Sequence, residues 1–381
     1  MHIAINAYFW NRPNTGSGQY TRQLVYHLNC LISDLTITLV YPHIAGRPPI
    51  ADVPPSVRVQ TVAIRPGDLE KVKFEQRTFP RVCKRLGVDL AHVPYWGSPL
   101  QSPVPTVVTV HDLTTLLVRE YRRGIKARLY TALVSAAARS AAHIITDSKA
   151  SQADIIKHLK IPAERVTPIY LAAGTAYKPD NELLMDMAIL KKYDLPDYYI
   201  LYLGGYEIHK NVTTLLLAYT YVAKALGEDY PLVLAGTKPD ESSPHIPPYE
   251  AHIAELGLTD SIHWAGFIDE KDKPAVYRGA ETFVFPSRYE GFGLPPLEAM
   301  ACGTPVVASN SSSLPEVVGD AGFAIDPDDE RQMGGSIIAT IVQEELAAEL
   351  KQKGLQQAAT FSWEKTATET LMIYSEVMDR K

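Results

Sequence analysis

The segment EGFGLPPLEAMACGTPVVAS, residues 290–309, carries two carboxylates that bracket a glycine-rich turn. Glu290 precedes the turn, and Glu298 lies in a helix that two consecutive prolines are expected to open, because a first-turn proline gives up no hydrogen bond. The N–H groups of Leu297 and Glu298 should then be free, and such groups attract phosphate. A nucleotide diphosphate sugar, charged in the middle and hydroxyl-rich at both ends, suits this arrangement.

The spacing of the two carboxylates argues against glycoside hydrolysis. Hydrolase carboxylates sit roughly 5 to 9.5 Å apart across one bond, whereas eight residues of helix span about 12 Å. We therefore expect Glu290 and Glu298 to hold two parts of one long ligand. The alternative, that both are solvated surface acids, is weakened by Gly291, Gly293 and the prolines between them.

A second glycine turn, NRPNTGSGQYT, follows the first expected strand and precedes a helix. Gly16 and Gly18 would let a ligand approach the backbone closely, as in a phosphate cradle. The third glycine of a dinucleotide fingerprint is replaced by Thr21, and the next strand ends without a ribose-binding acid. An NAD-dependent oxidoreductase is therefore a weak alternative, and a plain strand-to-helix turn is the structural one.

Two further strand ends carry polar residues. Gly204 and Gly205 end a strand in YLGGYEIHKN, and Lys210 stands near the next helix start, where an ammonium could neutralise a diphosphate. His111 and Asp112 end the strand PTVVTVHD, and His111 could hydrogen-bond a sugar hydroxyl or a reacting oxygen. The alternatives are an ordinary surface lysine and a histidine that only caps its strand.

Composition restricts the class of protein. The chain has 381 residues, enough for two domains, and its net charge of −6 does not favour a nucleic-acid binder. Cys30, Cys83 and Cys302 are unclustered and are each expected to be a small buried hydrophobe. No cluster has metal-ligand spacing, so neither a metal nor a bound cofactor is expected. No signal peptide or membrane span is recognisable, which favours a cytoplasmic protein.

Residues 71–139 carry twelve basic and four acidic side chains in a chain that is acidic overall. Basic residues beside Tyr121, Ile125 and Tyr130 could lean on an anionic membrane surface, which would make the protein peripheral at the inner membrane face. The alternative, slightly favoured, is a solvated helix face.

Short apolar runs alternate with helical segments along both halves of the chain, which predicts α/β domains with doubly wound parallel sheets. The strands expected in the first half are HIAINAYF, TITLVYP, VRVQTVAI, DLAHVPYW, PTVVTVHD and HIITDS, with helices around 18–30, 68–86, 124–141 and 149–159. The strands expected in the second half are YILYLG, YPLVLAGT, IHWAGFI, ETFVFPS, TPVVAS and GFAIDP. We expect a first Rossmann-like domain over 1–172, a linker over 173–197 and a second Rossmann-like domain over 198–360. The tail, 361–381, reads as a helix that crosses back to the first domain. Ligands of this architecture bind at the carboxyl ends of the strands, here in a cleft between the domains.

With these residues in hand, the chain resembles glycosyltransferase family 4, whose members have the two-domain GT-B fold. The strongest match is PSRYEGFGLPPLEAMACGTPVVAS, with two glutamates separated by seven residues. The segments GGYEIHKN, TGSGQYT and VHDL support the match. The resemblance runs from Gly16 to Trp363.

The resemblance implies a role for each motif residue. Glu290 would hold hydroxyls of the transferred sugar, Glu298 the ribose and Lys210 the diphosphate. His111 would sit beside the reacting carbon. The turn at Gly16 to Gly18 would close over the phosphates. The nucleobase would meet the strand end at Gly266, Phe267 and Ile268. The sugar and the adjacent phosphate would be lined by the backbone N–H groups of Gly291, Phe292, Gly293 and Leu294.

One position departs from the family pattern. Many members carry arginine where this chain has Gly205, so one phosphate contact is missing. Arg288 or His209 could substitute, and binding should depend more heavily on Lys210.

The resemblance implies a retaining, metal-independent hexosyltransferase that uses a nucleotide diphosphate sugar. GDP-linked mannose is favoured over UDP-linked glucose, with a saccharide or lipid-linked acceptor in polysaccharide or glycolipid assembly. The alternatives are an inactive relative that only binds a nucleotide sugar, the oxidoreductase, and an epimerase or phosphorylase on the same fold.

Overall fold

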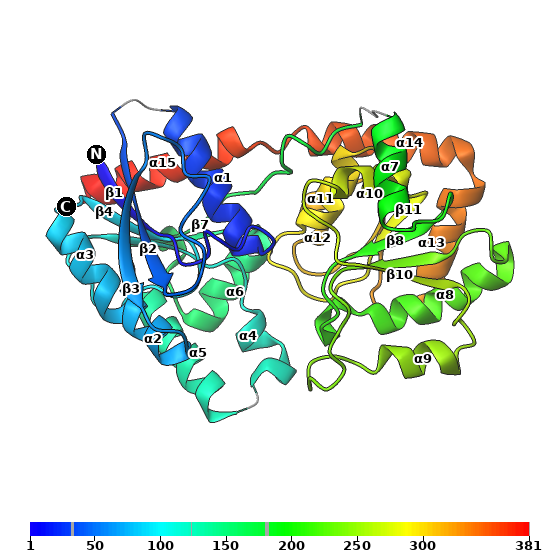
Figure 1. Cartoon of the computed structure of the whole chain (residues 1–381), viewed down its shortest axis with the longest axis horizontal. Helices are drawn as coiled ribbons and strands as arrows, with labels where there is room; N and C mark the ends of the chain where they lie inside the picture. The colour runs from blue at the N-terminus through cyan, green and yellow to red at the C-terminus, as the bar shows by residue number, and fades with distance from the viewer. Residues whose placement is uncertain (32–33, 123, 180–182, 381) are drawn as a thin grey trace. The chain divides into compact units, whose positions relative to one another are not determined.

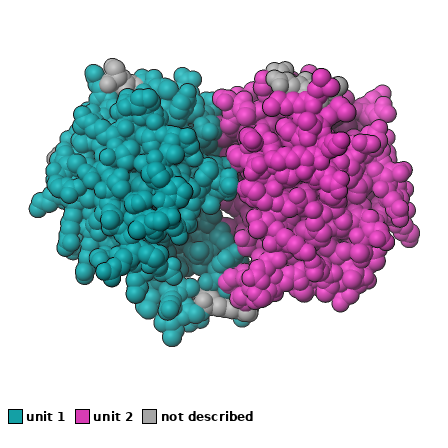
Figure 2. All heavy atoms as spheres, in the orientation of Figure 1, with its two compact units in different colours: residues 1–171, 362–381 teal, residues 172–361 magenta. Residues whose placement is uncertain are grey.

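The computed structural model describes residues 1–31, 34–122, 124–179 and 183–380 and divides into two compact units (Figure 2). Unit 1 comprises Met1–Leu171 and Ser362–Lys381, and unit 2 comprises Ala172–Phe361. Each unit is a parallel α/β layer structure, as the alternating pattern predicted. Arg123, counted in the basic stretch, lies outside the described residues.

Unit 1 is built on a seven-stranded sheet in the order β3-β2-β1-β4-β5-β6-β7, with every pairing parallel. Its strands are β1 (His2–Asn6), β2 (Thr36–Ile44), β3 (Arg58–Ile64), β4 (Leu90–Val93), β5 (Thr106–Thr109), β6 (His143–Thr146) and β7 (Val166–Pro168). The first six were predicted. The last was missed, because three residues ending in proline give no apolar run.

The helices of unit 1 are α1 (Gly16–Leu31), α2 (Asp68–Lys73), α3 (Phe79–Leu86), α4 (Thr114–Leu117), α5 (Ile125–Ser140), α6 (Lys149–Leu159) and α15 (Trp363–Asp379), with short turns η1 (Phe74–Thr78), η2 (Arg119–Arg122) and η3 (Ala163–Arg165). The terminal helix α15 packs on α1 (Figure 1), which confirms that the tail returns to the first domain. The helix expected over 68–86 contains a π-helical turn at η1.

Unit 2 contains a six-stranded parallel sheet in the order β10-β9-β8-β11-β12-β13. Its strands, all predicted, are β8 (Ile200–Leu203), β9 (Leu232–Ala235), β10 (Ile262–Gly266), β11 (Thr282–Phe285), β12 (Val306–Ser309) and β13 (Phe323–Ile325). The central strands β8 and β11 are buried on both faces and therefore read as continuous apolar runs.

The helices of unit 2 are α7 (Leu183–Lys192), η4 (Ile208–Lys210), α8 (Val212–Leu226), α9 (Tyr249–Glu255), α10 (Lys273–Gly279), α11 (Leu294–Ala301), α12 (Leu314–Val318), α13 (Glu330–Val342) and α14 (Glu344–Ala358). The segment expected as a linker, 173–197, is grouped with unit 2, and its helix α7 packs on α10. Residues 180–182 of that segment lie outside the described residues. Among the described helices, none combines the length and apolarity needed to span a bilayer.

Each sheet reverses its winding direction once. In unit 1 the chain runs from β1 outward to β3 and returns to β4 on the other side of β1; in unit 2 the same reversal separates β8 from β11. Ligands of open α/β sheets bind at the carboxyl ends of the strands beside such a reversal. The carboxyl ends of these strands are therefore where each unit's site is expected.

The cysteines only partly follow their prediction. Cys83 and Cys302 are buried, as expected, but Cys30 is exposed. Cys30 lies near the end of α1 and is not among the buried residues of this amphipathic helix.

Candidate active site

An ion pair joins the two sides of the reversal in unit 2. Lys210 ends η4, which follows β8, and Glu290 follows the neighbouring strand β11. Lys210 Nζ lies 2.7 Å from Glu290 Oε1, and the two side chains are 19% and 15% exposed. The two charges are thus largely removed from water but remain reachable. An entering ligand can take over both partners, an anion at the lysine and hydroxyl groups at the carboxylate.

Serine side chains hold the turn after Glu290 in place. Ser312 donates a hydrogen bond to the Glu290 carbonyl oxygen at 2.6 Å, and the single hydroxyl hydrogen of Ser313 is shared between the Phe292 carbonyl at 2.5 Å and the Glu290 carbonyl at 3.0 Å. Ser309 donates to the Ser287 carbonyl at 2.6 Å. Because these bonds satisfy the carbonyls of the turn, its shape is fixed before a ligand arrives.

The start of α11 differs from the prediction. The helix begins at Leu294, so the prolines occupy its second and third positions, and the Leu297 N–H donates to the Gly293 carbonyl at 3.3 Å. The prediction of a free N–H at Leu297 was therefore wrong. Since the prolines have no N–H, the first-turn donor is at Leu294. Gly293 has φ +128°, and an added Cβ would meet Leu314 at 2.8 Å, so glycine is required there.

Glu298 is almost completely buried. Its Oε2 accepts a hydrogen bond from the Tyr277 hydroxyl at 3.0 Å, and only 5% of the residue is exposed. Burial raises the pKa of Glu298 to about 7, against the lowering effect of the nearby Lys273. Its role toward a ribose stays a prediction, and such a contact requires a ligand that reaches well below the surface.

Three glycines lie at the carboxyl ends of three adjacent strands. Gly236, which the sequence did not single out, has φ +137°, and a Cβ there would stand 2.2 Å from the Gly204 carbonyl oxygen. Its N–H donates to the Gly266 carbonyl at 2.8 Å. A Cβ on Gly266 would meet nothing within 4 Å, so its backbone faces open space. This edge of the sheet is thus bare backbone.

The neighbours of these glycines differ in exposure. Phe267 is 47% exposed, whereas Ile268 is buried. Ile268 can therefore contribute backbone rather than side chain to any ligand. The space beside Gly205 is taken by the Glu207 carboxylate, which would stand 2.2 Å from an added Cβ.

Arg288 is engaged elsewhere and is a poor replacement for the missing phosphate contact at Gly205. It forms hydrogen bonds to Asp328 Oδ1 at 2.9 and 2.5 Å. Asp328 also forms an Asp-x-Asp pair with Asp326, which was not recognised as a metal-ligand pattern. In the structure, Asp326 Oδ1 accepts the Asp328 N–H. Over the described ranges, no group of three or more potential metal ligands comes together.

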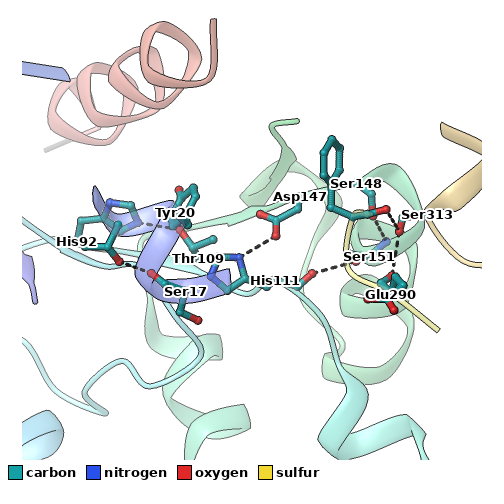
Figure 3. Close-up of polar contacts among 12 residues, drawn as sticks. Ser17, Tyr20, His92, Thr109, His111, Asp147, Ser148, Ser151, Glu290 and Ser313 are labelled. Atoms are coloured by element: carbon teal, nitrogen blue, oxygen red, sulfur yellow. Dashed lines mark hydrogen bonds and ion pairs between the residues drawn. The ribbon is translucent and has the colours of Figure 1, made fainter. Parts of the chain in front are cut away.

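In unit 1, His111 follows β5 and pairs with Asp147, which follows the neighbouring strand β6 (Figure 3). His111 Nδ1 lies 2.7 Å from Asp147 Oδ2, and the side chains are 20% and 4% exposed. Burial lowers the pKa of His111, but Asp147 and, to a smaller extent, Asp112 outweigh this effect and raise the pKa above its usual value. The surroundings of His111 therefore favour the protonated, positively charged imidazole.

Buried side chains support the histidine from behind. The Tyr20 ring meets the His111 ring edge to face at 5.0 Å, and the Tyr20 hydroxyl lies 3.0 Å from Thr109 Oγ1. Thr109 also contacts His92 Nε2 at 2.8 Å, and His92 Nδ1 contacts the Tyr374 hydroxyl of α15 at 2.6 Å. Burial lowers the pKa of His92 to about 3, so His92 stays neutral.

The glycine turn at the start of α1 is only partly open. A Cβ on Gly18 would stand 2.0 Å from the Arg12 carbonyl oxygen, so its free face is filled by the turn itself. Its N–H donates to Thr15 Oγ1 at 3.3 Å, whereas a Cβ on Gly16 would meet nothing within 4 Å. Gly16 therefore keeps the properties expected of a ligand-facing glycine, and Gly18 has a packing role.

Several supporting residues were not found from the sequence. Asp147 was within reach, because it ends a predicted strand beside His111 just as His111 ends its own. Ser312, Ser313 and Tyr277 carry no such signal, since their partners are far away in the chain. Their contacts appear only once the loops are folded.

Comparisons with known proteins agree with this arrangement. A family model described as "Glycosyl transferases group 1" matches residues 188–357, and one described as "Glycosyl transferase 4-like domain" matches residues 15–172. The chain is 37% identical over 270 residues to O-antigen chain mannosyltransferase B of Escherichia coli, covering 70% of this chain and 69% of that protein. It is 28% identical over 330 residues to MMP alpha-(1->4)-mannosyltransferase of Mycolicibacterium hassiacum, covering 84% and 74%.

Solved structures share the fold at low identity. Sucrose-phosphate synthase from Thermosynechococcus elongatus superposes with a TM-score of 0.81 at 22% identity, covering all of both chains. HepE of Anabaena, solved in complex with UDP and glucose, gives a TM-score of 0.73 at 17% identity, covering 98% of this chain and 99% of that one.

Proposed function

The chain belongs to the group 1 glycosyltransferases, with the GT-B fold, and we propose that it transfers mannose from a nucleotide diphosphate sugar to a hydroxyl of a saccharide or lipid-linked acceptor. The hexosyltransferase class follows from the family. The choice of mannose is supported by the two relatives named above, both mannosyltransferases. A GDP-linked donor is preferred and a UDP-linked donor is the next candidate, since HepE was solved with UDP.

The Lys210–Glu290 pair is the observation that carries the proposal. On donor binding, the Lys210 ammonium turns to the diphosphate and the Glu290 carboxylate accepts hydrogen bonds from sugar hydroxyls. The two groups stand 2.7 Å apart, so one ligand bearing phosphate beside a sugar can satisfy both. The exchange leaves neither charge unpaired, which is what a partly buried pair requires.

The chemical step follows from these positions. The acceptor hydroxyl oxygen bonds to the anomeric carbon of the sugar as the bond from that carbon to the β-phosphate oxygen breaks. The hydroxyl proton passes to the departing phosphate, and Lys210 stabilises the negative charge that develops there. His111, with its raised pKa, donates a hydrogen bond to the transferred sugar. Glu290 positions the sugar and forms no covalent bond. The acceptor hydroxyl approaches the anomeric carbon from the face that the phosphate leaves, so the anomeric configuration is retained.

We propose that transfer needs no divalent cation, because Lys210 and the Leu294 N–H at the start of α11 supply positive charge for the diphosphate. Assays with a chelator and with added Mg²⁺ test this point. Unchanged rates support it, and loss of transfer on chelation contradicts it.

A donor screen tests the proposal as a whole. Thermal unfolding is measured with UDP, GDP and ADP and with their glucose and mannose conjugates, since a tight ligand raises the melting temperature by mass action. We expect one base to dominate and its mannose conjugate to stabilise most. A chain that responds to no nucleotide sugar, or that binds one and catalyses neither transfer nor hydrolysis, would overturn the proposal.

A further inference from the structure

Unit 1 contains a pocket that none of the roles above uses. Its volume is about 320 Å³, at the lower end of the roughly 300–1,000 Å³ typical of small-molecule sites. It lies where the loop after β1 meets the loop between β2 and β3. We call it the arginine pocket; its polar and aromatic lining is Tyr8, Asn11, Arg12, Arg22, Tyr41, Arg47 and Asp52.

The walls of the arginine pocket are fixed by hydrogen bonds between the two loops. Asn11 Nδ2 donates to the Tyr41 hydroxyl at 3.0 Å and to the Pro49 carbonyl at 2.9 Å. Trp10 Nε1 donates to the Ala51 carbonyl at 2.7 Å. Because these hydrogen bonds shape the pocket before a ligand binds, ligand binding does not carry the entropic cost of ordering the two loops.

The charge of the arginine pocket is unbalanced. Arg22 is paired with Asp52, the acid of the lining, at 2.6 Å. Within the described ranges, Arg12 and Arg47 have no ion-pair partner; the Arg12 guanidinium lies over the Tyr8 and Phe9 rings at 5.6 and 5.4 Å. The lining therefore has three guanidinium groups and one carboxylate, which favours an anion.

A lysine adds to the positive charge near the arginine pocket. Lys71 Nζ lies 5.4 Å from the centre of the Tyr8 ring, which the Arg12 guanidinium also contacts. The acid nearest Lys71, Glu75 at 3.6 Å, is fully buried, and burial raises its pKa to about 7, which reduces its negative charge near neutral pH. The aromatic surface of Tyr8 and Tyr41 offers an apolar face beside these charges, as sugar rings require.

We propose that the arginine pocket binds a phosphate group carried by a saccharide, and that this saccharide belongs to the acceptor. Planar guanidinium groups match phosphate oxygens with paired hydrogen bonds, which makes phosphate the favoured anion over a single-point ligand. The acceptor role rests on the proposed function, whereas the phosphate site itself does not. A free sugar phosphate and a lipid-linked saccharide phosphate share this chemistry.

Calorimetric titration of the full chain with mannose 6-phosphate tests the site. We expect Arg12→Gln and Arg47→Gln each to raise the Kd about tenfold, the scale of one charged hydrogen-bond contact. Arg58→Gln, an exposed change at the opposite end of β3, is the matched control and should leave the Kd unchanged. Because Arg12 and Arg47 are exposed, their replacement should not disturb folding, which thermal unfolding checks.

Four further measurements identify where and how mannose 6-phosphate binds. Neutral mannose should bind at least tenfold more weakly than mannose 6-phosphate, and inorganic phosphate should compete with the latter. Lys210→Ala should leave the Kd unchanged, because Lys210 belongs to unit 2. Comparing the Kd of a mannose 1-phosphate ester of a short isoprenyl alcohol with that of mannose 6-phosphate distinguishes a lipid-linked source from a free one. The Kd of this ester must also rise in Arg47→Gln.

Equal affinity of wild type, Arg12→Gln and Arg47→Gln would overturn the inference, as would equal binding of mannose and its phosphate or loss of binding in Lys210→Ala. Failure of the proposed function reads differently. In that case no nucleotide sugar stabilises the chain, while the mannose 6-phosphate titration still responds to Arg12 and Arg47.

Discussion

Each unit carries a charged pair at the carboxyl edge of its sheet, but the two pairs are built differently. His111–Asp147 and Lys210–Glu290 both have a contact of 2.7 Å. Asp147 is 4% exposed and His111 is backed by buried side chains, whereas Glu290 is 15% exposed and lies in a turn held through its carbonyls. In the His111–Asp147 pair, the surroundings favour the positively charged form of the His111 imidazole. In the Lys210–Glu290 pair, both side chains can exchange partners, as donor binding and release require.

The largest expected effect comes from breaking the exchangeable pair. Lys210→Ala and Glu290→Ala should each lower kcat at least about 10³-fold, because each removes an interaction with the reacting diphosphate or sugar. Lys210→Arg should retain more activity than Lys210→Ala. Steady-state transfer kinetics measure the change, with thermal unfolding as the check on folding. Wild-type turnover in Glu290→Ala would refute its role.

The fixed pair should respond to pH instead. The pKa of His111 is raised. If transfer needs the protonated imidazole, kcat/KM is highest at low pH and falls as pH rises through that pKa. Asp147→Asn removes the main raising influence, so kcat/KM should begin to fall at a lower pH, with roughly tenfold less activity at pH 8.

Asp112→Asn is the matched control for this pH effect. Asp112 raises the pKa of His111 less than Asp147 does, so its replacement should move the pH profile of kcat/KM by less. Identical profiles for wild type and Asp147→Asn would show that protonated His111 is not required.

The two glycines of the turn at the start of α1 should differ in how much their replacement lowers stability. Gly18→Ala forces a Cβ against the Arg12 carbonyl and should cost about 2 kcal/mol, lowering the melting temperature of unit 1 by roughly 4–8 °C. Gly16→Ala, two residues away, faces open space and should leave stability within about 0.5 kcal/mol. Differential calorimetry of the two variants decides the matter; equal melting temperatures would contradict the packing role of Gly18.

Each unit also contains a buried carboxyl whose pKa is raised to about 7, Glu75 in unit 1 and Glu298 in unit 2. A raised pKa favours the folded state when the group is protonated. This stability is present below the unfolded pKa, near 4.5, and is lost as pH rises through about 7.

Glu75→Gln and Glu298→Gln should therefore lose less stability than wild type between pH 5 and 8, by on the order of 1–2 kcal/mol. Urea unfolding across this range measures the difference. The exposed Glu255→Gln is the control and should follow wild type. Parallel pH profiles for all four proteins would show that the buried carboxyls do not titrate in this range.

Local pattern explains why so much of the fold was predictable. Twelve of the thirteen strands were recognised, because strands such as β8 and β11 are buried on both faces and appear as apolar runs. Lys210, Glu290 and His111 were recognised because each follows such a run, and parallel strands bring their carboxyl ends to one edge. The π-helical turn of η1 was not predictable, since it depends on long-range packing around Glu75.

The start of α11 shows a second limit. Two prolines correctly indicated a helix start, but the donors free for a ligand depend on which residue is first in the helix. The helix starts at Leu294, one residue before the first proline, so the Leu297 N–H bonds the Gly293 carbonyl and the only N–H among the first three helical residues is that of Leu294. Sequence patterns rarely fix helix boundaries that closely.

The central claim is that one ligand takes over both Lys210 and Glu290. Titration calorimetry with a nucleoside diphosphate and with its mannose conjugate, against wild type, Lys210→Ala and Glu290→Gln, tests it most directly. We predict that Lys210→Ala weakens both ligands. Glu290→Gln should bind the diphosphate at least as tightly as wild type, because Lys210 is released from its partner, and should lose the added affinity that the sugar provides. If Glu290→Gln keeps the wild-type preference for the mannose conjugate, the claim is contradicted.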